Sequence, residues 1–197
     1  MKKIILILFF ASVCVQTQVE TRTLNNGNLI LEDVPNVPEE IKKELKGYQN
    51  IRSASFRGFK PDNEGVFIST RFGDVGQLHV VDRPLGMRKQ VTFFDEPIGS
   101  VSVQPNGGLI AFTMDSGGSE NAQIYVMNPE NGRTVLVSDG ESRNGSVLWS
   151  RDGEKIAFGT TRRNGASNDV WVMDYKYPEQ AKICLLYTSP SPRDTIR

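Results

Sequence analysis

Short runs of alternating apolar and polar residues fill the middle of the chain, and the same pattern occurs three times between Arg52 and Asp174. The three copies read FKPDNEGVFIST then QLHVVD, VQPNGGLIAFT then QIYVMN, and WSRDGEKIAFGT then DVWVMD. Equivalent positions lie 44 or 46 residues apart: Pro61, Pro105 and Arg151 are separated by 44 and 46 residues, and Gln77, Gln123 and Asp169 by 46 and 46. A period of this size indicates a repeat architecture.

Each repeat predicts four short strands in the same order. The first strand is expected over 53–56, 100–103 and 146–149, and the second over 66–69, 109–113 and 155–159. Turns rich in Pro, Asp, Asn and Gly separate these two strands. Apolar residues alternate through the third strand around positions 78–80, 124–126 and 170–172. The fourth strand is expected over 90–93 and 134–137, and the same spacing reaches Ile183 in the third repeat.

Four short strands in every 45 residues or so are typical of a propeller blade. No stretch between Arg52 and Asp174 has sustained helical periodicity, which argues against parallel βαβ units. The predicted fold is therefore all-β, an incomplete β-propeller of about three four-stranded, WD40-like or TolB-like blades over residues 51–183. Propellers close with about four to eight blades, so we expect a longer protein of which this is the front section.

Residues 1–18 are predicted to be a signal peptide. Lys2 and Lys3 precede a short apolar run, whereas a membrane-spanning helix needs about 20 apolar residues. The chain is therefore expected to be exported, to the periplasm or the medium, with no other membrane span. A lipoprotein attached through Cys14 is the alternative.

Residues 19–50 form a lead-in to the repeats, with a strand expected at 28–32. A helix is expected from Pro38, because proline fits the first turn and Glu39 and Glu40 favour the positive end of the helix dipole. Ile41, Leu45 and Tyr48 then form an apolar stripe, which we expect to pack on the propeller.

Residues 184–197 have no counterpart in the other repeats. Their sequence resembles the translation of a sequencing-adapter junction, so this tail is expected to be non-native. A disordered Ser/Pro tail is the alternative.

Composition removes several functional classes. The 197 residues carry a formal net charge of zero and no basic stripe, which argues against nucleic-acid binding. The only cysteines are Cys14 in the presumed leader and Cys184 in the tail, so no disulfide or thiolate metal site is expected in the body.

No catalytic residue is predicted. The nucleophile pattern G-x-S-x-G is absent, and Ser100, Ser119 and Ser146, each preceded by glycine, lack its spacing. His79 is the only histidine and hence the only possible base of that type. It shares its repeat position with Tyr125 and Trp171, so we expect it to fill a structural slot.

Metal and cofactor sites are not expected either. The adjacent acids Asp95-Glu96 and Glu39-Glu40 do not have the spacing of a metal-ligand set. Asp115, Glu120 and Asp139 are scattered through loops. Loops 115–121 and 162–168 lack a phosphate-binding motif and are interpreted as connections between strands.

Three further features are assigned structural roles. The triplet Asn144-Gly145-Ser146 matches a glycosylation acceptor but is interpreted as a turn. Arg162 and Arg163 are interpreted as an exposed basic turn rather than a site for an acidic peptide end. The aromatic residues that recur in the blades are expected to pack between them rather than to stack on a ligand: Phe112, Trp149, Phe158 and Trp171.

Several stretches of the repeats are specific enough to identify a family: the chain resembles the propeller domain of the prolyl oligopeptidase (S9) family of serine peptidases. The resemblance covers about residues 26–183 and is carried most specifically by TRFGDVGQLHVVD and TFFDEP, with NIRSASFRGFKPD and TRRNGASNDVWVMD in support. It implies a propeller that limits the access of peptide substrates to a C-terminal α/β-hydrolase domain. That domain is missing from this sequence, so the resemblance assigns no catalytic residue.

A second class is also consistent with the repeats. TolB-like periplasmic propellers share the [WF]-S-x-D-G turn and the IAF and V-M-D strands, and they bind protein partners without catalysis. A sizeable domain precedes their blades, whereas only about thirty mature residues do so here. A propeller that binds sugars or polyanions has no positive support in the sequence.

Overall fold

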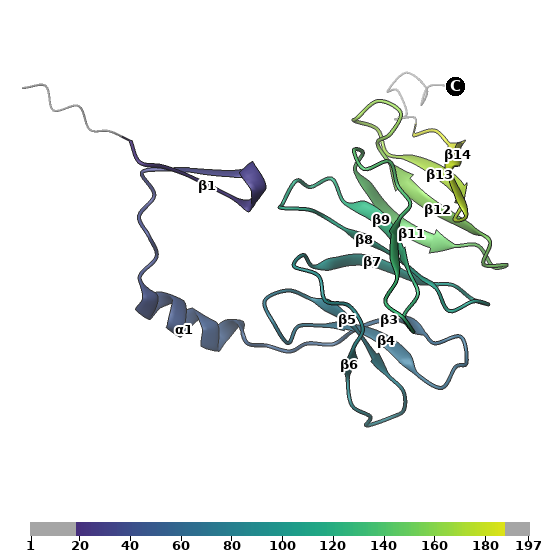
Figure 1. Cartoon of the computed structure of the whole chain (residues 1–197), viewed down its shortest axis with the longest axis horizontal. Helices are drawn as coiled ribbons and strands as arrows, with labels where there is room; N and C mark the ends of the chain where they lie inside the picture. Colours follow the sequence, from purple (N-terminus) through teal and green to yellow (C-terminus); the bar gives the residue numbers. More distant parts are fainter. Residues whose placement is uncertain (1–18, 188–197) are drawn as a thin grey trace, which may run out of the picture.

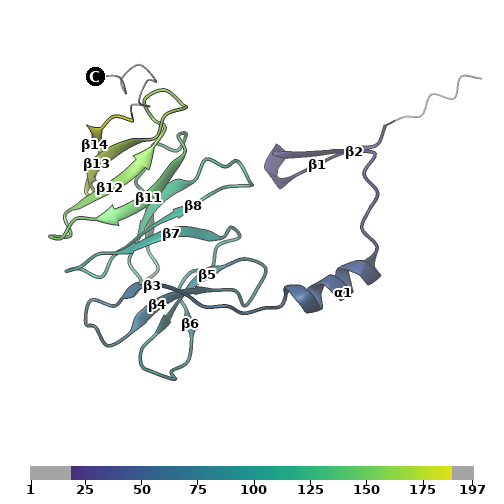
Figure 2. The same cartoon turned by 180° about the vertical axis from the view of Figure 1, so that it is seen from behind.

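The computed structural model describes residues 19–187, which form three four-stranded sheets, a two-stranded hairpin and one α-helix (Figure 1). All sheets are antiparallel, and each large sheet pairs four consecutive strands in chain order. The three large sheets stand beside one another as the blades of a fan (Figures 1 and 2). The predicted all-β fold, an incomplete propeller with three four-stranded blades, is therefore confirmed.

The blades are numbered in chain order. Blade 1 contains β3 (Ser55–Phe59), β4 (Val66–Thr70), β5 (Gln77–Val81) and β6 (Lys89–Gln90). Blade 2 contains β7 (Ile98–Val103), β8 (Ile110–Met114), β9 (Gln123–Met127) and β10 (Thr134–Leu136). Blade 3 contains β11 (Asn144–Trp149), β12 (Lys155–Thr160), β13 (Asp169–Asp174) and β14 (Tyr177–Leu185).

Each blade has two faces, because side chains alternate along a strand. We call the face toward the preceding blade the N-side face and the face toward the following blade the C-side face. Directly paired residues share a face, so the registers identify equivalent positions in different blades. Ile68 with His79, Phe112 with Tyr125 and Phe158 with Trp171 are such equivalent pairs, all on N-side faces.

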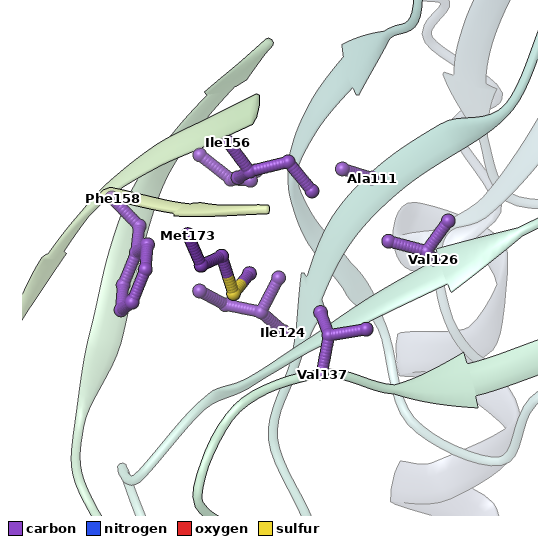
Figure 3. Close-up of a cluster of buried hydrophobic side chains, with 8 residues drawn as sticks. Ala111, Ile124, Val126, Val137, Ile156, Phe158 and Met173 are labelled. Atoms are coloured by element: carbon purple, nitrogen blue, oxygen red, sulfur yellow. The ribbon is translucent and has the colours of Figure 1, made fainter. Parts of the chain in front are cut away.

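The hydrophobic core lies in the seams between blades. One cluster joins the C-side face of blade 1 to the N-side face of blade 2 and includes Phe67, Leu78, Ile110, Phe112 and Met127. The second joins blades 2 and 3 (Figure 3), with Ala111, Ile124, Val126 and Val137 facing Val147, Ile156, Phe158 and Met173. Trp149 and Trp171 pack against this second cluster, so the expected packing of the recurring aromatics between blades is confirmed.

The outer strand of blade 3 departs from the repeat. Trp171 pairs with Ile183, whereas its blade 2 equivalent Tyr125 pairs with Leu136, so β14 is shifted by one residue from the predicted spacing. Register shifts flank this part of the strand. Register is weakly specified where neither face of a strand is buried, and most of β14 is exposed.

The lead-in forms a hairpin and a helix. Strands β1 (Thr21–Leu24) and β2 (Leu29–Glu32) pair through the turn η1 (Asn25–Gly27), which confirms a strand near 28–32. Helix α1 (Glu39–Gln49) begins directly after Pro38, as predicted. No membrane-spanning helix occurs within residues 19–187, and the predicted signal peptide lies outside the described residues.

The predicted packing of α1 on the propeller is wrong. The helix buries none of its residues, and Tyr48 in its apolar stripe is 81% exposed. Figures 1 and 2 both show α1 standing away from the blades at the end of an extended segment. An amphipathic pattern identifies an apolar face but does not supply a surface within reach of it.

Phe112 offers a direct test of the seam core. Its ring is fully buried and lies 5.6 Å from the ring of Tyr125 and 5.7 Å from that of Phe94. Phe112→Ala is expected to lower the free energy of unfolding by about 3–5 kcal/mol, because it removes buried apolar surface and leaves a cavity. Chemical denaturation measures the change, and Phe93→Ala, at a position 77% exposed, should alter it by less than about 0.5 kcal/mol.

Candidate functional site

Each blade has a buried polar residue at the start of its third strand that hydrogen-bonds to a later segment of the chain: Gln77, Gln123 and Asp169. In blade 2, Gln123 Oε1 accepts hydrogen bonds from Ser138 Oγ (2.6 Å) and Gly140 N (3.0 Å). Its Nε2 donates to the carbonyls of Asn121 and Ser142, both at 2.8 Å. One buried amide thus ties the strand to the loop that leads into the next blade, a structural role.

Gln77 makes the equivalent hydrogen bonds in blade 1. Gln77 Oε1 accepts from Thr92 Oγ1 (2.8 Å), and Gln77 Nε2 donates to the carbonyls of Phe94 (2.9 Å) and Glu96 (3.0 Å). Thr92 Oγ1 in turn accepts from the backbone N–H of Leu78 at 2.9 Å. Because every polar atom of the glutamine is used internally, this position has no group left for a ligand.

Blade 3 carries a carboxylate at this position. The buried Asp169 accepts from Arg163 Nε at 2.6 Å and Nη2 at 3.2 Å, and from the backbone N–H of Tyr187 at 2.8 Å. These hydrogen bonds hold the pKa of the Asp169 carboxyl below its ordinary value, with the Arg163 bond the largest cause. Asp169 is therefore ionised and fully paired.

The predicted basic turn is exposed but structurally engaged. Arg163 pairs with Asp169, while Arg162 lies 3.5 Å from Asp139 of blade 2 and 5.2 Å from the centre of the Trp171 ring. Both guanidinium groups therefore stabilise blade 3 and its contact with blade 2, and neither is held free for an acidic peptide end.

A cavity of about 470 Å³ opens between blades 1 and 2 at the end of the blades that carries the first turns. Its apolar floor includes Phe67, Val80 and Val91, and Lys60 and Asp82 stand at its edge. Lys60 Nζ lies 3.0 Å from Asp62 and 3.4 Å from Asp82, and Lys89 Nζ lies 2.6 Å from Asp82, so two lysines balance two carboxylates. The hydrogen bond to Asp62 raises the pKa of Lys60, whereas the pKa of Asp62 is lowered first by the backbone N–H of Glu64 and that of Asp82 first by Lys89, with Lys60 adding to both.

Gln104 closes the equivalent seam between blades 2 and 3, together with Asn106, whose Nδ2 donates to the carbonyl of Asp152 at 3.4 Å. Gln104, at the repeat position of Lys60, is buried and donates from Nε2 to the carbonyl of Gly153 at 2.6 Å. Lys60 instead turns back toward the carboxylates of its own blade. The cavity thus lies at the seam where the repeat carries Lys60 in place of the buried Gln104, and none of its lining residues is a serine, cysteine or histidine.

His79 occupies a packed structural slot, as its repeat position suggests. It is 1% exposed, its ring lies 5.1 Å from that of Phe72, and its Nδ1 lies 3.1 Å from the carbonyl of Gln77. Its Nε2 has no hydrogen-bond partner among the described residues. Burial lowers the pKa of His79, opposed by the Gln77 carbonyl and aided by the charge of Arg88.

The structure does not assemble a catalytic group around His79. Ser100 and Ser146 lie on β7 and β11 of the other two blades, and Ser119 Oγ donates to Asp115 at 2.6 Å within its own loop. Among residues 19–187, the His79 side chain contacts one polar group, the Gln77 carbonyl, and no hydroxyl or carboxylate of the kind a catalytic triad requires.

The loop acids organise turns. Asp115 accepts from the backbone N–H groups of Ser116 and Glu120, and Asp139 accepts from those of Glu141 and Ser142. Within residues 19–187 no cluster of three metal-ligating side chains of the His, Cys, Asp and Glu types occurs.

The interpretation of Asn144-Gly145-Ser146 as a turn is wrong, since Asn144 begins strand β11. The Asn144 side chain is buried, and its amide donates to the carbonyls of Ser142 (2.7 Å) and Ala122 (3.0 Å). An amide that is buried and doubly bonded is unavailable for glycosylation in the folded chain.

One long-range contact was not predicted from the sequence. At the tip of the lead-in hairpin, Asn28 Nδ2 donates to the carbonyl of Gly117 at 2.6 Å. Gly117 has φ of +61°, and its N–H donates to Glu96 Oε1 at 2.7 Å. A glycine suits this place because it adopts positive φ readily and lets the asparagine-rich tip approach closely.

Comparison with solved structures supports the fold. The chain is similar to a putative TolB from Agrobacterium tumefaciens (TM-score 0.57, 15% identity, 87% of this chain and 62% of that one) and to TolB from Acinetobacter baumannii (0.56, 16%, 84% and 37%). It is equally similar to a structure from a study of two prolyl endopeptidases (0.56, 13%, 89% and 33%). The chain therefore spans between a third and about three fifths of these proteins. No protein-family model and no curated protein matches the sequence.

His79 predicts a pH-dependent stability. Its pKa is lowered in the folded state, so the folded chain binds its proton less readily than the unfolded chain. Stability should be fully present above the unfolded pKa of about 6.5 and fall as the pH drops below it. Because the chain has one histidine, NMR of untagged protein reports this group alone, with an expected midpoint below about 6.5. A midpoint at or above that value would contradict the expectation, and His79→Gln should remove this step from denaturation curves.

Gln104 and Lys60 form a matched pair for testing the two seams. Gln104→Ala should lower the free energy of unfolding by about 1–3 kcal/mol, because it leaves the Gly153 carbonyl without its buried donor. Lys60→Ala should cost less than about 1 kcal/mol, since it removes a partly exposed ion pair. Equal losses in chemical denaturation would contradict the assignment of Gln104 as the closing residue.

Proposed function

We propose that this chain is the non-catalytic propeller part of an exported serine peptidase of the prolyl oligopeptidase family. In the whole protein the propeller would limit peptide access to a C-terminal α/β-hydrolase domain, which supplies the catalytic serine, aspartate and histidine. The observation that carries the proposal is the specific sequence of blade 1, TRFGDVGQLHVVD followed by TFFDEP, on a fold similar to prolyl endopeptidase.

The geometry of the chain supports a non-catalytic role. The sole histidine is buried against a carbonyl, and the loop carboxylates are engaged in turns and ion pairs. The partners in this proposal are the hydrolase domain and, for the whole protein, peptides. Export is inferred from residues 1–18, and residues 184–197 are inferred to be a translated adapter.

A TolB-like propeller that binds protein partners in the periplasm is the second candidate. Its support is the similarity of the fold to two TolB structures, with TM-scores of 0.57 and 0.56. The prolyl endopeptidase structure scores 0.56, so the fold favours both candidates equally. The blade 1 strings TRFGDVGQLHVVD and TFFDEP distinguish the two candidates, because they resemble the peptidase family specifically, whereas the turns of the later blades are shared with TolB-like propellers.

The coding DNA beyond the Ile183 codon separates these candidates. We expect the frame to continue through further blades into G-x-S-x-G, followed by an aspartate and a histidine. A frame that ends after several more blades without this motif would favour the TolB-like candidate. A stop codon after a genomic 184–197 would show that the tail is genuine.

The purified full chain is expected to cleave no peptide. No described residue forms a nucleophile–base pair, so hydrolysis of peptide substrates should stay at the level of a buffer control. His79→Gln is the matched variant: any activity that this substitution abolishes, and that a serine-directed inhibitor blocks, would refute the non-catalytic assignment.

A further inference from the structure

The turns between the first and second strands of blades 1 and 2 are built alike. Each is closed by a backbone hydrogen bond, from Lys60 N to the carbonyl of Gly65 at 2.9 Å and from Gln104 N to the carbonyl of Leu109 at 2.7 Å. Lys60 and Gln104 therefore hold the same position, and each is followed by a proline. Because each residue lies at the end of one seam, the two side chains can be compared directly.

Gln104 fills the end of the seam between blades 2 and 3. Its Nε2 donates to the carbonyl of Gly153 at 2.6 Å, and its Oε1 accepts from the backbone N–H of Leu109 at 3.3 Å. The residue is buried, and its Cγ lies 3.1 Å from the position that a Cβ would take at Gly153. This seam therefore holds a nitrogen donor carried on an aliphatic stem.

At the equivalent place between blades 1 and 2 lies the cavity of about 470 Å³. Small-molecule sites typically have volumes of about 300–1,000 Å³, with an apolar lining and a few polar groups. Phe67, Val80 and Val91 supply the apolar lining here, while Gly107 and Gly108 present backbone rather than side chains. Both walls belong to blades that already face each other, so the cavity does not depend on further blades.

The charged groups around the cavity favour a cation. Asp62, Asp82 and Glu130 contribute three carboxylates to the lining, against the single ammonium group of Lys60. Lys60 lies between the two aspartates, and Lys89 also pairs with Asp82. None of the ion pairs formed within residues 19–187 involves Glu130. Glu130 therefore supplies a negative charge that no lysine of the cavity balances.

We propose that this cavity binds a small primary amine with an aromatic or branched aliphatic body. The body packs on Phe67, Val80 and Val91, and the ammonium group is attracted by the carboxylate of Glu130. Such a ligand joins a nitrogen donor to an apolar stem, as Gln104 does in the next seam. The inference goes beyond the proposed function and does not rest on it, because every residue that lines the cavity belongs to blades 1 and 2 or their turns.

Titration of the full chain with benzylamine, followed by NMR of the valine methyl groups, tests the proposal. Benzylamine is a cation at neutral pH and should shift the methyl signals of Val80 and Val91 until the site is saturated. Val66 and Val81, which line a separate hollow of about 290 Å³, should not shift. The proposal is overturned if Val80 and Val91 show no saturable shift, or if the saturable shifts fall on Val66 and Val81 instead.

Benzyl alcohol tests the role of charge, because it keeps the ring of benzylamine without the ammonium group. It should bind about two- to fivefold more weakly, and Glu130→Gln should weaken benzylamine by the same factor while leaving benzyl alcohol unchanged. Equal affinities for the two probes would overturn the assignment to a cation. Tighter binding of acetyl-Gly-Lys-Gly-amide than of benzylamine would overturn the assignment to a small amine and indicate a lysine side chain of a protein partner.

Lys60→Gln tests whether the cavity is the binding site. A glutamine at this position should cross the seam as Gln104 does and raise the Kd of benzylamine about tenfold or more, because close packing leaves no room for the ring. Lys89→Gln is the matched control: it removes a lysine from the same ion pairs but is not part of the cavity lining, so the affinity should stay unchanged or rise. An unchanged Kd in Lys60→Gln, or equal weakening in both variants, would overturn the site.

Discussion

Burial of apolar side chains between neighbouring blades is the interaction on which this structure depends. A four-stranded sheet of this size cannot cover its own two faces, so each blade is stabilised by the next. Both hydrophobic clusters lie in the seams, and each draws its members from the C-side face of one blade and the N-side face of the next. Stability therefore depends on adjacent pairs of blades, and the two outermost faces lack a neighbouring blade that would bury their apolar side chains.

Buried polar side chains reinforce the blades and the seams between them. Gln77 and Gln123 tie the end of one blade to the beginning of the next, and Asp169 takes the same place with Arg163 as its donor. Gln104 then links the turns of blades 2 and 3 directly. The buried polar side chains at these positions therefore act as links between strands and between blades.

The repeat made most of the fold predictable, because residues a fixed distance apart meet the same environment. The aromatic positions and the structural place of His79 follow from that regularity. The predictions that failed concern residues whose structure depends on their surroundings in the fold, which the sequence does not specify. The stripe of α1 has no blade within reach, and β14 shifts because its faces are largely exposed. The triplet Asn144-Gly145-Ser146 was predicted to be a turn, yet Asn144 begins a strand and its buried amide donates to two backbone carbonyls.

The hairpin contact at Gly117 has a consequence for the order of folding. Asn28 and Gly117 are separated by 89 positions, so the earliest-made segment of the body binds a loop that is synthesised much later. Domains fold largely in the order of synthesis, at about 5–20 residues per second. The hairpin must therefore wait several seconds, with blade 1 complete, before blade 2 offers its binding site. During that interval the lead-in hairpin has no binding site. Its contact with Gly117 can form only once the 115–121 loop of blade 2 is in place.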